Sequence, residues 1–80
     1  MHELAITKQL VEDLLKLVKD MDLPKVKKVV VDIGDKTSYK AEPMNYYFDE
    51  LKTHYEAIKE TIFQGQEIIG KNVMLKEIEV

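Results

Sequence analysis

The stretch that decides the fold is Val26-Lys27-Lys28-Val29-Val30-Val31-Asp32-Ile33. Three consecutive β-branched valines favour a strand over a helix, because their side chains are stiff about χ1. In a strand, Val29, Val31 and Ile33 share one face, and Val30 points to the other face. Since apolar residues occupy both faces, we predict that residues 26–33 form a central or mostly covered strand.

The residues before this strand have the pattern of an amphipathic helix over about Leu4 to Asp20. Its apolar residues recur at spacings of three and four and form one stripe: Leu4, Leu10, Val11, Leu14, Leu17, Val18 and Met21. Pro24 ends any helix before it, because proline pushes the preceding residue out of helical geometry. Glu3 lies in or just before the first turn, where the positive end of the helix dipole stabilises a carboxylate.

The residues after the strand predict a loop and then a second helix. Gly34 to Glu42 is polar and without periodicity, and Pro43 suits the first helical position because its missing N–H costs nothing there. A second apolar stripe follows at helical spacing: Met44, Tyr47, Phe48, Leu51, Tyr55, Ile58 and Ile62. We therefore expect a helix from Pro43 to about Ile62, the longest element of the chain, with Gly65 ending it.

The C-terminal part predicts a short strand, a turn and a final strand. Glu67 to Ile69 can form the short strand, and Gly70-Lys71-Asn72 has the composition of a hairpin turn. Val73 to Val80 forms the last strand, but its apolar alternation slips, since Val73 and Leu75 share one parity whereas Ile78 and Val80 share the other. A β-bulge near Lys76-Glu77 would return them to one face.

The order of these elements is α-β-α-β-β. It predicts a two-layer α+β domain spanning residues 1–80, with two helices packed on one face of a small mixed three-stranded sheet. A right-handed crossover through the second helix would place the next strand parallel to the first. The edges of so small a sheet invite pairing, so we also expect that the chain can form a homodimer.

Composition and charge exclude several classes of function. Eighty residues, 45% hydrophobic and 34% charged, are typical of one small soluble domain. A net charge of −3 and a pI near 5.3 argue against nucleic-acid binding. No apolar run approaches the roughly 20 residues of a membrane span, and the first residues do not resemble a secretory signal. We expect a cytoplasmic protein that binds neither nucleic acid nor membrane.

Nothing in the sequence supports catalysis. The chain has no cysteine, no glycine-rich phosphate loop, and a single serine, Ser38, without an evident base. The adjacent carboxylates Glu12-Asp13 and Asp49-Glu50 lie on expected helices, where neighbouring residues do not face each other. We therefore predict that the protein is not an enzyme.

The start of the chain, Met1-His2-Glu3, carries the only evident chemistry. The amine of Met1, the amide of His2 and the His2 imidazole can close fused chelate rings on one metal. With the amide deprotonated, this set suits square-planar Ni(II) or Cu(II). Many proteins begin Met-His, however, and a frayed terminus is the simpler interpretation of these residues alone. For Glu3, a helix-dipole role and a metal-related role both stay open, and His54 is a minor candidate for a further ligand.

Four segments resemble the HypA/HybF family of nickel-insertion accessory proteins. Met1 to Thr7 is similar to the opening of that family, and Lys27 to Asp35 is similar to its first strand and the following turn. Pro43 to Phe48 resembles the start of its second helix, and Leu75 to Val80 resembles its closing strand. The match is poor from about Thr53 to Asn72.

The resemblance implies a nickel-binding, metallochaperone-like protein of [NiFe]-hydrogenase maturation, and of urease maturation in some organisms. In the family, nitrogens of the Met-His-Glu start hold Ni²⁺, which implies Met1, His2 and Glu3 as the metal site here, with His2 as the key ligand. The implied partners are the nickel-handling GTPase HypB and the hydrogenase large subunit. The alternative is a metal-independent interaction or dimerisation module derived from the same domain.

One departure from the family is clear. The family carries a zinc-binding module, built on paired Cys-x-x-Cys motifs before the last strand, whereas this chain has no cysteine. Two histidines, His2 and His54, do not make a closed tetrahedral zinc site. We therefore expect no zinc. The missing module puts in doubt the partner docking and metal sensing assigned to it, but not the terminal nickel site.

Overall fold

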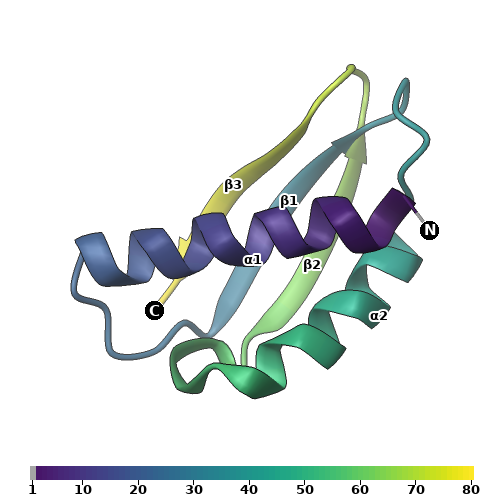
Figure 1. The fold of residues 1–80 in the computed structure, drawn as a ribbon. Helices are drawn as coiled ribbons and strands as arrows, with labels where there is room; N and C mark the ends of the chain where they lie inside the picture. Colours follow the sequence, from purple (N-terminus) through teal and green to yellow (C-terminus); the bar gives the residue numbers. More distant parts are fainter. Residues whose placement is uncertain (1) are drawn as a thin grey trace.

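The computed structural model describes the backbone of residues 2–80 and the side chains of residues 3–80. Both helices cover one face of a three-stranded mixed sheet, which confirms the predicted α+β fold class (Figure 1). The elements, in chain order, are α1 (His2–Asp20), β1 (Lys28–Gly34), α2 (Ala41–Leu51), the 3₁₀ turns η1 (Lys52–His54) and η2 (Glu56–Ile58), β2 (Ile62–Ile68) and β3 (Val73–Glu79). None of the helices in this described range is long and apolar enough to cross a membrane.

The valine-rich strand β1 lies in the centre of the sheet, as predicted. The strand order is β2-β1-β3, with β1 parallel to β2 and antiparallel to β3. Val29, Val31 and Ile33 are at most 1% exposed and face the helices. The parallel pairing of β1 with β2 also confirms the expected crossover through α2 to a parallel neighbour.

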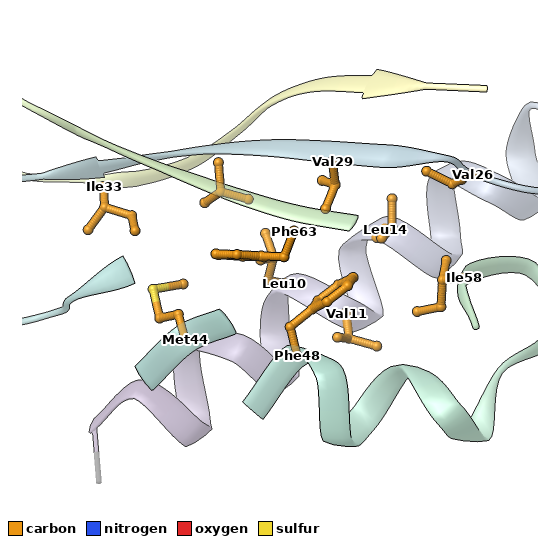
Figure 2. Packing of buried hydrophobic residues seen from close by; sticks show 11 residues of the cluster. Leu10, Val11, Leu14, Val26, Val29, Ile33, Met44, Phe48, Ile58 and Phe63 are labelled. Atoms are coloured by element: carbon orange, nitrogen blue, oxygen red, sulfur yellow. The ribbon is translucent and has the colours of Figure 1, made fainter. Parts of the chain in front are cut away.

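The core lies between the sheet and the two helices (Figure 2). Leu10 and Leu14 of α1 and Phe48 of α2 point into it, and all three are buried. The ring of Phe48 packs against the ring of Phe63 of β2, with centroids 5.4 Å apart. This contact fixes α2 against the edge strand, since buried aromatic pairs contribute beyond their area alone.

The second helix is much shorter than predicted. α2 ends at Leu51 rather than near Ile62, and 19-residue α1 is the longest element. The side-chain hydroxyl of buried Thr61 donates to the carbonyl of Val26, and the N–H of Ile62 donates to the carbonyl of Lys27. Ile62, which fits the helical period, therefore begins β2 instead, and a β-branched residue is well suited to a strand.

The predicted hairpin turn at Gly70-Lys71-Asn72 is wrong, and the strand expected over residues 67–69 is present but begins earlier, at Ile62, and ends at Ile68. β2 runs over Ile62–Ile68, and β2 and β3 do not pair, because β1 lies between them. The connection instead crosses the end of β1: Gly34 N–H donates to the Asn72 carbonyl and Lys36 N–H to the Gly70 carbonyl. Turn composition is local information and does not reveal that a third strand separates the two.

The predicted β-bulge is confirmed. Val30 pairs with Glu77 and the next residue, Val31, pairs with Leu75, so Lys76 is the extra residue. The bulge changes the parity of β3 and brings Ile78 to the same, helix-covered face as Leu75.

Candidate metal centre

The candidate site lies at the start of α1, which begins at His2. The first four N–H groups of a helix have no partner within the helix. The amide nitrogens of His2 and Glu3 are therefore not needed for the hydrogen bonds that hold α1 together. Met1 and the His2 side chain lie outside the described residues, so Glu3 is the one predicted site residue whose side chain the structure places.

The Glu3 side chain ties the first turn of α1 to the start of α2. Its Oε2 accepts a hydrogen bond from the backbone N–H of Lys40 at 3.3 Å. Lys40 is the N-cap residue of α2, has an extended backbone, and provides no side-chain cap of its own. Glu3 is only 9% exposed, and its carboxylate thus satisfies the N–H of the N-cap residue of α2.

The surroundings of Glu3 lower the pKa of its carboxyl group. The largest cause is a hydrogen bond from its own backbone N–H, and the N–H of Lys40 adds to it, while burial acts in the opposite direction. Hydrogen bonds donated to the ionised form stabilise that form. Glu3 therefore carries a negative charge at neutral pH, at the point where two helix N-termini meet.

Thr7 holds the same turn from the other side. It is fully buried, and its hydroxyl donates to the backbone carbonyl of Glu3, one turn back along α1. Such a bond from a threonine to the carbonyl four residues earlier occupies the side chain inside the helix. Glu3 is therefore fixed at both its backbone and its carboxylate.

His54 does not belong to this site. It is exposed in η1, beyond the C-terminal end of α2, with its ring 6.4 Å from that of Tyr55. The N-terminal end of α2 lies at Glu3, and the helix in between is roughly 16 Å long at 1.5 Å per residue. Among the described residues, no three His, Cys, Asp or Glu side chains gather around a potential metal position.

Sequence reasoning missed two members of this arrangement, the N–H of Lys40 and the hydroxyl of Thr7. Thr7 lies four residues after Glu3, a spacing that could have indicated the contact. The bond between Glu3 and Lys40 joins residues 37 positions apart, and no local pattern marks it.

Comparison with known proteins finds similarity over nearly the whole chain. Residues 1–76 match the model of a protein family described as "Hydrogenase/urease nickel incorporation, metallochaperone, hypA". The chain belongs to the HypA family. Over 73 residues it is 36% identical to a protein named hydrogenase maturation factor HypA from Caldanaerobacter subterraneus subsp. tengcongensis, which covers 91% of this chain. The family is thus one of metal-handling maturation factors, and its description names no catalytic reaction.

A solved structure of the family shares the fold. The solution structure of the Ni metallochaperone HypA from Helicobacter pylori superposes with a TM-score of 0.76 at 16% sequence identity, covering 94% of this chain and 70% of that one. The present chain spans 59% of the length of its Caldanaerobacter relative. The family match over residues 1–76 includes Met1-His2-Glu3, both helices, β1, β2 and the first part of β3.

Proposed function

We propose that this chain binds Ni²⁺ at its first three residues and hands it on as a HypA-type accessory protein of [NiFe]-hydrogenase or urease maturation. Met1 supplies its terminal amine, and His2 supplies its backbone amide and its imidazole. These nitrogens form a tetragonal set that suits Ni²⁺. The observation that carries the proposal is the family match over residues 1–76, which includes an intact Met1-His2-Glu3.

The position of the site at a helix start supports this chemistry. Deprotonation of an amide inside a helix would break a backbone hydrogen bond, whereas the first amides of α1 make no such bond. Nickel binding at His2 therefore leaves the helix intact.

Glu3 has a different role from the one its place in the motif indicates. Its carboxylate already accepts the N–H of Lys40, so we assign it to positioning and charge rather than to direct coordination. The positive end of a helix dipole opposes a bound cation. The ionised, lowered-pKa carboxylate of Glu3 offsets this repulsion for a nickel ion held next to it.

The test is a Ni²⁺ titration of protein with its native terminus. Binding is measured by calorimetry and by the d–d absorption of a square-planar complex. His2→Ala and a form extended by one residue before Met1 should each lose affinity by more than the roughly 10–100-fold that removal of a supporting second-shell group costs. His54→Ala is the matched control and should bind nickel like the parent chain. Equal affinity in the parent, His2→Ala and the extended form would refute the proposal.

The remaining parts of the proposal concern partners, domain and location. We propose that residues 1–80 act as one nickel-binding domain, in the cytoplasm and without a catalytic step of its own. Its partners would be the nickel-handling GTPase HypB, as source or co-carrier, and the hydrogenase large subunit, as acceptor. Pull-down of each purified partner with and without Ni²⁺ separates this function from its alternative, a metal-independent interaction module, which would bind equally in both conditions.

A further inference from the structure

The two edges of the sheet differ in how well they are protected against pairing. β3 carries the bulge at Lys76 and the charged residues Glu77 and Glu79. Bulges and charges, lysine above all, are the features by which proteins keep an edge strand from pairing with another chain. β2 pairs with β1 in an uninterrupted register, has no lysine or proline, and has Glu67 as its single charge. β2 is therefore the edge that is open to a partner strand.

The sequence of β2 is symmetric about its centre. Ile62-Phe63-Gln64-Gly65-Gln66-Glu67-Ile68 reads Ile-x-Gln-Gly-Gln-x-Ile in both directions. If two copies of β2 pair antiparallel with Gly65 on the two-fold axis, Gln64 lies opposite Gln66 of the second copy, and Ile62 lies opposite Ile68. These four positions share the face of the sheet that the helices leave open, and Ile62 is 63% exposed there.

The backbone groups of β2 fit the same register. The N–H of Ile62 and the carbonyl of Ile68 point toward β1, since they bond to Lys27 and Asp35. Backbone groups alternate in direction along a strand, so the N–H and C=O groups of Phe63, Gly65 and Glu67 point outward. In the register centred on Gly65 these outward residues pair with one another, which is the arrangement of hydrogen-bonded pairs in an antiparallel ladder.

We propose that β2 is a homodimer interface, through which two copies of this chain form a continuous six-stranded sheet with strand order β3-β1-β2-β2-β1-β3. The two-fold axis passes through Gly65, whose missing Cβ makes room for Ala41 of α2 within the same chain. The occupant is a second copy because the strand matches itself at the four open-face positions, where Ile faces Ile and Gln faces Gln, and because its outward backbone groups pair in the same register. This inference is independent of the nickel site and goes beyond the proposed function.

The interface consists of one strand pair, so the association is weak and belongs with the small, transient class. The measurement must therefore cover concentrations from micromolar to about millimolar, by sedimentation equilibrium and by amide hydrogen exchange followed by NMR. The expected result is a dimer whose formation protects the outward amides of Phe63, Gly65 and Glu67 as the concentration rises. The amides of Gln64 and Gln66, which point toward β1, serve as internal controls and should be protected at all concentrations.

A pair of double variants tests the register. Gln64→Lys with Gln66→Lys places like charges opposite each other twice across the axis, whereas Gln64→Glu with Gln66→Lys places opposite charges there. In the parent chain the Nε2 of Gln66 donates to the Oδ1 of Asp32 at 3.2 Å. Both double variants replace this residue by the same Gln66→Lys, so the change beside Asp32 is equal in the two. The like-charged variant should raise the dissociation constant at least about tenfold, because like charges directly opposite destabilise a strand pair. The opposite-charged variant should dimerise at least as well as the parent chain.

The like-charged variant also has a net charge closer to zero than that of the parent chain. General charge repulsion between monomers would therefore change in the direction opposite to the predicted loss. A chain that stays monomeric at millimolar concentration would overturn the proposal. A dimer in which both double variants behave alike, or in which the outward amides exchange at the same rate at every concentration, would overturn it equally, since the copies would then meet elsewhere.

Discussion

Substitution of Gly34 by alanine tests how tightly the connection between β2 and β3 crosses the end of β1. A Cβ at this position would lie 2.4 Å from the carbonyl oxygen of Gly70, 2.5 Å from its carbonyl carbon and 2.9 Å from the amide nitrogen of Lys71. All three are backbone atoms, so a side-chain rotation cannot relieve the clash. The whole connection must move away from β1.

The energetic cost follows from the bonds that this movement breaks. Three backbone hydrogen bonds join the residues at positions 34–36 to the connection: Gly34 N–H to Asn72, Asp35 N–H to Ile68 and Lys36 N–H to Gly70. At about 0.5–1.5 kcal/mol for each net hydrogen bond, Gly34→Ala should lower the free energy of unfolding by about 2–4 kcal/mol. An 80-residue domain has about 4–12 kcal/mol in total, so the loss is large.

The matched control is Gly70→Ala in the same connection. A Cβ there meets no atom within 4 Å, and none of the described glycines has a positive φ. Replacing such a glycine restricts the unfolded chain and stabilises a protein by about 0.4–1 kcal/mol. The assay is urea unfolding followed by circular dichroism at one fixed protein concentration. The reasoning fails if Gly34→Ala unfolds within about 0.5 kcal/mol of the parent chain, or if Gly70→Ala loses as much as Gly34→Ala.

Two further predictions concern the site and the core. In metal-free protein, the lowered pKa of Glu3 means that its ionised form stabilises the folded state at pH values above the ordinary pKa of 4.5. This stabilisation is lost as the pH falls from 4.5 through the lowered pKa. Glu3→Gln should therefore lower the Tm at pH 7, with a difference that shrinks as the pH falls below 4.5; a difference that is constant with pH would contradict it. Phe48→Ala, at a fully buried position, should cost about 3–5 kcal/mol. Tyr46→Ala, at a residue 62% exposed, should stay within about 0.5 kcal/mol in the same urea titrations.

The parts of the fold that the sequence predicted are those in which local pattern and burial coincide. The valine run of β1 is buried on both faces because it is central, and this is what its composition indicated. The slip in the alternation of β3 identified the bulge at Lys76, since Leu75 and Ile78 both pack against the core although they differ in parity.

The end of α2 was mispredicted because two periods overlap there. Tyr55, Ile58 and Ile62 fit a helical stripe, yet Ile58 is buried in a 3₁₀ turn and Ile62 is exposed at the start of β2. β2 itself gave no clear signal, because Gln64 and Gln66 lie on the open face and Gly65 interrupts the apolar pattern. Pairing with β1 decided the conformation, and pairing is not a local property.

For the candidate site the sequence supplied a proposed ligand set, which stays a prediction. The motif named Met1, His2 and Glu3, but it could not show that the carboxylate of Glu3 is occupied by the N–H of Lys40. That contact depends on how α2 packs beside α1, and therefore on the finished fold. The contact supports the positioning role that we propose for Glu3.

The central place of β1 also bears on how the chain folds. Both neighbours of this early strand arrive late, since Lys28 pairs with Ile62 on one side and with Glu79 on the other. Such distant pairings make the search for the native topology slow compared with that of a helical bundle of similar size. During synthesis the valine run therefore lacks both of its partner strands, and can aggregate or bind chaperones, until the residues of β2 and β3 have left the ribosome.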